Sequence, residues 1–485
     1  MAAIPTAPAA PVDTSGNPYK VILKLAAPTV VAMLTQSVVN EIDIVFFAHL
    51  PCPESSDAQA ALLPSLIVLW LFGGSLSAIS VGTQAWTARR MGEGKPEEAG
   101  AVLMNAWFFA LTAGVVFTVG GYLAMPHIVR GLIKVEAVQV AATSYLQWRL
   151  LGIVSMAVTF AFKAFFDAIG KTHVHLISAV VMNAINIAVC YLFIFGAHGM
   201  PRMGIGGAGL GGFVSTWIGL FIMVGYALKR EFRHGFHPFD LRKLDRRLTW
   251  GILKLSIPSA IATVAVMSGF AMFSWIVSKL DAMNAASLVS SECGRAQAVN
   301  SAATTDIVGV LKLTFTACLA FGTSAATLVS QSLGSGKPED ARKFGWVAVK
   351  LGLVIFGVVG VCEGLLFTKP ILAFVTHSPE VQAAALLPMR TMGLCTPLIA
   401  VGMILTQALF GAGRAMFVMI VELVLHFTCL VPLAWLLGIT LNLGLPGIWA
   451  AAVVYVFGLC GVMVWKFAKG DWQEVKLEVA PRAAG

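Results

Sequence analysis

Three polar side chains stand four and three residues apart inside an apolar stretch near the start of the chain: Gln36, Asn40 and Asp43. On an α-helix this spacing places them within about 60° of one another, on one face. An acid inside a membrane is energetically unfavourable and normally faces a protein interior or water. A carboxyl flanked by amides is suited to bind and release a proton. The pattern predicts an ion-coupling site at Asp43, with simple anchoring at the outer interface as the alternative.

Two further polar pairs occupy apolar stretches. Asn183 and Asn186 share one face of their helix and are predicted to support the same coupling site, although hydrogen bonding between helices explains them nearly as well. Glu422 and His426 are spaced i, i+4 and form a titratable pair in the second half of the chain. This pair is the rival coupling site.

Other polar, Met and aromatic side chains in the apolar stretches can be explained by structural roles as well as by functional ones. Glu41 points about 140° away from Gln36 and is either an outer-rim acid or part of a substrate cavity. Lys163 and Asp167 are spaced i, i+4 and predict an internal ion pair. A Met and aromatic stripe suits varied hydrophobic ligands, although helix packing explains it too; the cavity candidates on it are Met267, Phe270 and Phe273. No His/Cys/acid cluster predicts a metal site.

The composition explains why these residues matter. Of 485 residues, 58% are hydrophobic and 12% charged, and the mean hydropathy is +0.83, whereas soluble domains carry about 25% charged residues. A spanning helix needs about 20 apolar residues. By that rule the chain contains twelve segments: Val21–His49, Ala60–Ala88, Glu97–Ala124, Val138–Ile169, Val174–Gly196, Gly206–Leu228, Trp250–Leu280, Thr305–Ser332, Phe344–Phe367, Ala383–Gly411, Met416–Leu437 and Gly447–Phe467.

The basic residues orient these helices. With the N-terminus placed in the cytoplasm, 21 Lys and Arg fall in inner loops and six in outer loops. Because inner loops are the basic ones, both termini are expected in the cytoplasm and the protein in the plasma (inner) membrane. The net charge of +9 is then an insertion signal, and nucleic acid is not an expected partner.

The second half of the chain repeats the first. KLAAP at 24–28 returns 230 residues later as KLSIP, and GEGKPEEA at 92–99 returns 242 residues later as GSGKPEDA. The difference places an insertion of about twelve residues near 281–306. Six helices per copy is an even number, so the copies are parallel repeats with a site expected at their interface. The fold class is therefore an all-α polytopic membrane protein, with twelve transmembrane helices in two pseudo-symmetric six-helix bundles.

The expected organisation follows from these boundaries. It comprises a disordered cytoplasmic N-terminus (1–19), an N-lobe (20–228), a basic cytoplasmic linker (229–249), a C-lobe (250–469) and a cytoplasmic tail (470–485). One cavity is expected between the lobes, bounded by helices one, two, seven and eight. Cys52 and Cys293 lie in equivalent outer loops and are expected to approach one another across its mouth.

No motif supplies chemical energy or catalysis. The two GxGKPE turns lack the P-loop pattern, and no HExxH or GxSxG grouping is present, so the protein is predicted not to be an enzyme. No filter-like repeat supports a channel. What remains is transport without an organic cofactor, by ion coupling or by a passive route.

The same residues carry a family resemblance. A proline early in helix one (Pro28), the NEID run at 40–43, the two GxGKPE turns and the DAIGKT and FGAGR turns resemble the multidrug and toxic compound extrusion (MATE) family over roughly residues 20–469. Asp43 stands fifteen residues after Pro28, as in the branch named for DNA-damage induction (DinF-like). That branch also tends to carry an acid where this chain has Cys190.

The resemblance implies a function. It implies a secondary active multidrug efflux transporter, a monomer in the lipid bilayer that exchanges H⁺ or Na⁺ for drug-like, amphipathic and often cationic compounds, with Pro28 as a hinge in helix one. A lipid-linked precursor flippase of the same superfamily is the alternative. That alternative requires several basic residues in the cavity, for which the candidates are Arg149, Lys163, Lys312 and Arg390.

Overall fold

The computed structural model describes residues 11–52, 54–133, 135–283, 288–290, 296–376 and 378–477. Within these residues ten helices are long and apolar enough to span a membrane, and two bent helix pairs bring the number to twelve. The first half contains α1 (Pro18–Ala48), α2 (Glu54–Phe72), η1 (Gly74–Ala78), α3 (Ile79–Gly92), α4 (Pro96–Leu132), α5 (Glu136–Leu151), α6 (Ile153–Ala168), α7 (Thr172–Phe195), η2 (Ala197–Gly199) and α8 (Ile205–Ala227).

The second half continues the helical order after a short connection formed by α9 (Arg230–Phe236) and η3 (Leu241–Lys243). It contains α10 (Arg246–Met283), β1 (Leu288–Ser290), β2 (Ala296–Ala298), α11 (Val299–Gly334), α12 (Pro338–Val361), η4 (Cys362–Leu366), α13 (Thr368–Val375), α14 (Pro379–Gly411), α15 (Ala415–Val424), η5 (Leu425–Leu430), α16 (Val431–Trp435), η6 (Leu436–Thr440) and α17 (Gly444–Lys469). The twelve predicted spans correspond to these helices or bent pairs.

Both bent spans lie in the first half and break at glycine. The helices before and after Gly73 differ in direction by 45°, and those before and after Gly152 by 46°. At Gly73 a β-carbon would lie 2.5 Å from Met156 Cε of α6, so a larger residue there would displace the end of that side chain. The apolar stretch continues through both breaks, which is why hydropathy alone predicted one long segment at each.

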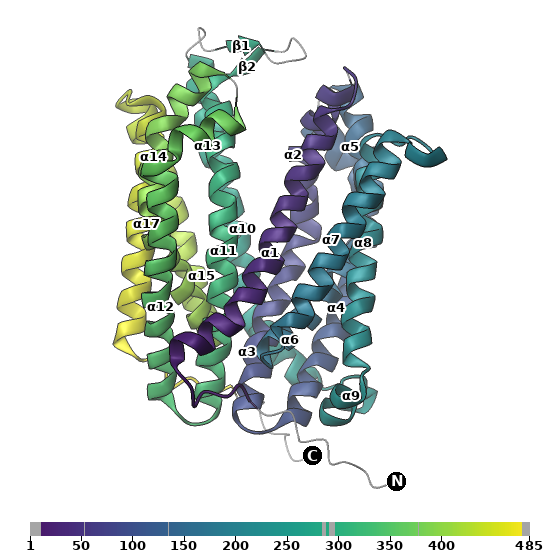
Figure 1. Cartoon of the computed structure of the whole chain (residues 1–485), viewed down its shortest axis with the longest axis vertical. Coiled ribbons are helices and arrows are strands. Elements are labelled where there is room, and N and C mark those ends of the chain that lie inside the picture. The colour runs from purple at the N-terminus through teal and green to yellow at the C-terminus, as the bar shows by residue number, and fades with distance from the viewer. Residues whose placement is uncertain are drawn as a thin grey trace.

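The helices form two bundles that converge at the end where both termini lie and diverge toward the other end (Figure 1). We call α1–α8 the N-lobe and α10–α17 the C-lobe, and the end that carries the termini the terminus side. The main contacts between the lobes are those of α1 with α11 and of α3 with both α10 and α11. These are the first and second spans of each repeat, which the sequence predicted at the interface.

The first and last described segments of the chain, near Val12 and Val475, pack against the terminus side. Near the N-terminal end of the described residues, the Val12 N–H donates to Gln331 Oε1 at 3.0 Å. After α17 the chain turns at Gly470, and the Trp472 side chain is fully buried. Arg89 of α3 then donates to the Val475 carbonyl at 3.2 Å. The tail of the C-lobe therefore contacts the N-lobe.

The insertion on the opposite side contains the antiparallel strands β1 and β2, in which Leu288 pairs with Ala298. Asp281 at the end of α10 accepts hydrogen bonds from the backbone N–H groups of Asn300 and Ser301, at 3.0 and 2.9 Å. It thereby supplies hydrogen-bond acceptors to two backbone N–H groups in the first turn of α11, which have no partner within the helix. Cys52 is disulfide-bonded, whereas Cys293 lies outside the described residues.

Candidate functional site

A polar group lies inside the N-lobe around Asp43. Asp43 belongs to α1, Arg149 to α5 and Cys190 to α7. Asp43 is half-buried, with Arg149 and Cys190 as its electrostatic neighbours. The Arg149 guanidinium lies over the Tyr145 ring, 5.7 Å from its centroid. The predicted coupling acid therefore has a cation beside it. Sequence reasoning had considered Arg149 only as a basic cavity residue, because nothing in its spacing connects it to helix one.

Two adjacent glycines of α8 make room for this group. A β-carbon at Gly212 would lie 2.0 Å from Arg149 Nη1, and one at Gly211 would lie 2.4 Å from Cys190 Sγ. Both distances are far below van der Waals contact, so larger residues would displace the guanidinium and the thiol. Glycines at these positions are thus part of the site.

The predicted supporting amides have different surroundings. Asn186 Nδ2 donates to Ser215 Oγ at 3.3 Å, and the Cys190 thiol donates to Asn186 Oδ1 at 3.6 Å. Asn183 is buried, and neither atom of its amide has a hydrogen-bond partner among the described residues. Gln36 is half-buried, and the side chain of Asn40 lies outside the described part. Asn183 is therefore a buried amide whose hydrogen-bonding capacity is unused by the described residues.

Glu41 is positioned by the other lobe. Its Oε1 lies 3.0 Å from Lys312 Nζ of α11, and both side chains are about 40% exposed. Nearby, Ser37 Oγ donates to Thr316 Oγ1 at 3.3 Å across the same interface. Glu41 is thus an inter-lobe ion-pair partner.

The three residues predicted to line a substrate cavity differ in their exposure. Met267 and Phe270 are 45% and 39% exposed, as a lining residue requires. Phe273 is 2% exposed and packs edge-on against Trp449 at 5.3 Å. The prediction that Phe273 lines a cavity is wrong, because that face of α10 packs into the C-lobe core.

The rival site in the C-lobe is a compact polar group. Tyr455 OH donates to Glu422 Oε2 at 2.9 Å, and His426 Nδ1 lies 3.4 Å from the same oxygen. Both Glu422 and His426 are buried. His426 lies in η5, a π-helical stretch, and such stretches are frequent at functional sites. A β-carbon at Gly269 of α10 would lie 2.6 Å from the His426 ring, so the glycine admits the imidazole.

A third polar group closes the terminus side between the lobes. We call it the terminus-side gate and define it as Gln84, Asp167, Thr323, Thr327, Ser330 and Gln331. Gln84 Nε2 donates to the Thr323 carbonyl and to Thr327 Oγ1, at 2.8 and 2.9 Å. Gln331 Nε2 donates to the Ala168 carbonyl at 2.7 Å, and Ser330 Oγ to the Ala85 carbonyl at 2.8 Å.

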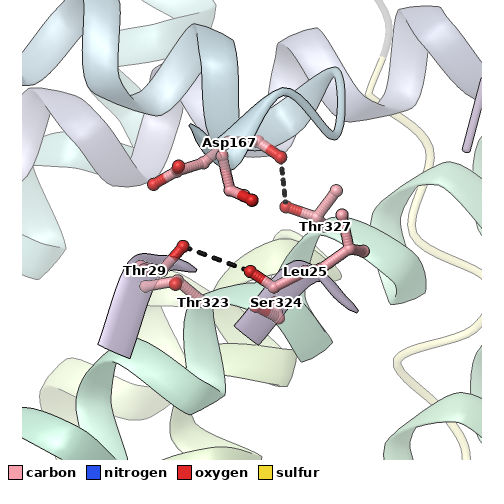
Figure 2. A pocket seen from close by; sticks show the side chains of 7 residues that line it. Leu25, Thr29, Asp167, Thr323, Ser324 and Thr327 are labelled. Atoms are coloured by element: carbon pink, nitrogen blue, oxygen red, sulfur yellow. Dashed lines mark hydrogen bonds between the residues drawn. The ribbon is translucent and has the colours of Figure 1, made fainter. Parts of the chain in front are cut away.

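The gate is tightly closed. Figure 2 shows Asp167 of the N-lobe facing Thr323, Ser324 and Thr327 of α11, with Leu25 and Thr29 of α1 beside them. Thr327 Oγ1 donates to the Asp167 carbonyl at 3.2 Å, and the space enclosed has no room for a water molecule. The Asp167 carboxylate lies 3.1 Å from Lys163 Nζ, which confirms the predicted ion pair.

Comparisons with known proteins agree with this architecture. The MatE family model matches residues 28–192 and 258–436. The chain is 25% identical over 467 residues to the probable multidrug resistance protein NorM of Thermotoga maritima, covering 94% of this chain and 93% of the relative. It is 25% identical over 457 residues to the multidrug resistance protein PmpM of Pseudomonas aeruginosa, covering 93% and 91%.

Solved structures share the fold. A crystal structure of a MATE protein in complex with MaL6 superposes with a TM-score of 0.82 at 20% identity, covering 95% of this chain and 98% of that one. A MOP superfamily transporter from Pyrococcus furiosus gives the same TM-score at 19% identity, with the same coverage. The chain therefore belongs to the MatE family and is an efflux transporter of that family rather than an enzyme.

Proposed function

We propose that this chain exports drug-like, amphipathic organic compounds in exchange for H⁺, and that Asp43 is the coupling carboxylate. The observation that carries the proposal is the position of Asp43, half-buried in the N-lobe with Arg149 and Cys190 as its electrostatic neighbours. The names of the relatives, multidrug resistance proteins from several bacteria, support the substrate class. Helix one supports a DinF-like assignment, with Cys190 in place of the expected second acid.

Charge explains how a proton could displace a substrate there. With Asp43 ionised, its charge and that of Arg149 cancel, and the site tolerates an organic cation. Once Asp43 is protonated, the charge of Arg149 is uncompensated and repels that cation. Na⁺ would have to bind the Asp43 carboxylate directly, and so at close range to the guanidinium, where like charges repel in a low-dielectric interior; a bulky organic cation can keep its charge farther away. We therefore favour H⁺ over Na⁺ as the coupling ion.

Helix α1 connects this site to the gate. Thr29 lies at the terminus-side gate and Asp43 fourteen residues later, about 21 Å along a helix. Pro28 lies inside α1 and cannot donate the backbone hydrogen bond of its turn. We propose that α1 bends at Pro28 when Asp43 changes its protonation state. The bend would loosen the contacts of Leu25 and Thr29 with α11 and permit alternating access.

The test is substrate-dependent proton flux in liposomes, with and without a Na⁺ gradient. Asp43→Asn should abolish coupled export, while folding and membrane insertion remain intact. Glu422→Gln should retain most of the parental flux. A fully active Asp43→Asn protein together with an inactive Glu422→Gln protein would contradict the assignment. It would favour the second candidate, a coupling site formed by Glu422, His426 and Tyr455.

The flippase alternative is less well supported by the side chains. It requires basic residues free to hold a diphosphate headgroup. Lys163 is paired with Asp167 and Lys312 with Glu41, and Arg149 lies beside Asp43. Export of an organic cation but not of a lipid-linked sugar is the expected outcome when both are offered.

We also propose that the protein acts as a monomer in the plasma (inner) membrane with both termini cytoplasmic. The asymmetry of 21 inner against six outer basic residues supports this orientation. In inverted membrane vesicles, which expose the cytoplasmic face, protease should remove a C-terminal epitope. In intact spheroplasts the same epitope should be protected.

A further inference from the structure

An apolar cavity of about 220 Å³ lies in the N-lobe, away from Asp43 and from the gate. It is lined from α4, α6, α8 and the linker by Trp107, Leu111, Val154, Val158, Phe162, Trp217, Leu220, Val224 and Phe239. An apolar cavity of ~150 Å³ in a protein stays free of water and takes up benzene. This cavity is larger, so it has room for an apolar group bigger than one aromatic ring.

The linker between the lobes forms one wall. Its carbonyl at Pro238 accepts a hydrogen bond from Trp107 Nε1 at 3.3 Å, and the Phe239 ring lies 6.1 Å from that of Trp107 and 6.2 Å from that of Phe162. A β-carbon at Gly100 would lie 1.7 Å from the Phe236 carbonyl oxygen. The linker is therefore packed closely on α4 and holds Phe239 at the terminus-side end of the cavity.

The cavity adjoins the surface that faces hydrocarbon. Phe108 and Phe221 are neighbours in sequence of the lining residues Trp107 and Leu220, and they are 39% and 63% exposed. Helices as apolar as these expose such side chains to lipid tails rather than to water. Alkyl chains are thus the molecules at hand to occupy a cavity without polar surface.

The linker also brings basic side chains to the same end. Lys243 Nζ is buried without a hydrogen-bond partner among the described residues, and it forms a long ion pair, 3.8 Å, with Oε2 of the exposed Glu97. Lys229 Nζ rests over the Tyr226 ring at 3.7 Å from the centroid. Lys243 follows Phe239 by four residues, and Lys229 follows Val224 by five. Basic side chains at such a boundary attract anionic lipid headgroups.

We propose that the N-lobe binds one anionic phospholipid, with a segment of one acyl chain in the cavity and the phosphate at Lys243 and Lys229. Transfer of the chain from the bilayer into the cavity gives little hydrophobic gain, because lipid tails are as apolar as the lining. The phosphate contact therefore determines which lipid is selected. The site is separate from the transport route, so its test does not depend on the function proposed above.

The headgroup is tested by native mass spectrometry of the full chain released from bilayers with equal amounts of phosphatidylglycerol and phosphatidylcholine. The parental protein should retain one phosphatidylglycerol at least fivefold more often than phosphatidylcholine. Lys243→Gln should reduce that ratio to near one. Lys254→Gln, which removes an exposed lysine from the first part of α10, is the matched control and should leave the ratio unchanged.

The acyl chain is tested with phosphatidylglycerol brominated on its tails, which quenches the fluorescence of tryptophans in contact with them. Val158→Phe fills part of the cavity and should remove the share of quenching that comes from Trp107 and Trp217. Val158→Leu, a smaller change, serves if the Phe variant fails to fold. Equal retention of the two lipids, equal ratios for Lys243→Gln and Lys254→Gln, or unchanged quenching in the filled variants would each overturn the proposal.

Discussion

Replacement of Gln331 by Met should open the terminus-side gate. The side chain is buried and makes two hydrogen bonds, from Nε2 to the Ala168 carbonyl at 2.7 Å and from the Val12 N–H to Oε1 at 3.0 Å. Met has similar length but makes neither bond. In the closed state the two backbone groups then lack partners, whereas in the open state water satisfies them. At about 1 kcal/mol for each bond, the closed state loses about 2 kcal/mol.

That loss corresponds to about a 30-fold rise in the population of the open state, since 1.4 kcal/mol is tenfold. The readout is the rate at which a polar maleimide alkylates a cysteine at position 330, quantified by peptide mass spectrometry. Ser330 is fully buried between the lobes, and Ser330→Cys is common to all samples compared. The alkylation rate should rise about 30-fold in the Gln331→Met protein.

The control is Gln382→Met. Gln382 Nε2 donates to the Thr376 carbonyl at 2.8 Å, within one lobe and far from the gate. Its replacement should leave the alkylation rate unchanged. If Gln331→Met also leaves the rate unchanged while the protein keeps the parental melting temperature, the hydrogen bonds of Gln331 do not hold the gate closed and the reasoning is refuted.

Three further outcomes are expected. Gly92→Ala places a β-carbon 2.0 Å from the Gln331 carbonyl oxygen, so it should raise the alkylation rate at position 330 as well. Trp472→Ala removes a fully buried ring and should lower the free energy of unfolding by about 3–5 kcal/mol, measured by denaturant titration. The hydrogen bond from Lys466 holds the pKa of Asp471 below its ordinary value, so its stabilisation of the tail is present above about pH 4 and is lost as the pH falls through the lowered value. Protease cleavage of the tail should accordingly be slow from pH 8 to pH 5, and over that range it should be faster in Asp471→Asn.

The sequence was sufficient for the number of spans, the repeat and the family, because all three depend on patterns along one chain. It was not sufficient for the breaks near Gly73 and Gly152, since hydropathy measures how long an apolar stretch is and not where it bends. The π-helical turn that carries His426 was missed for the same reason, because one extra residue per turn leaves the composition unchanged. The bent spans and the π-turn are features of packing.

For the side chains of the candidate site, too, the sequence predicted local arrangement but not tertiary contacts. Periodicity placed Gln36, Asn40 and Asp43 on one face of a helix, because residues three and four apart are neighbours on a helix. It could not show that Arg149 lies beside Asp43, since the two are brought together by the packing of α1 and α5 within the N-lobe. Tyr455, the hydrogen-bond partner of Glu422, was missed likewise. Tertiary partners leave no trace in local spacing.

The two lobes share a fold but not a chemistry. Phe273 follows Pro258 by fifteen residues, the interval that separates Asp43 from Pro28, so the repeat places a phenyl ring where the other lobe has its acid. That ring is packed against Trp449 in the C-lobe core. Among the described residues, the C-lobe instead has a buried titratable carboxyl group on α15, at Glu422, and another, Asp281, at the far end of α10, where it caps α11. The C-lobe therefore has no coupling acid at the position equivalent to Asp43. At that position the side chain of α10 packs in the lobe core, whereas that of α1 is an acid.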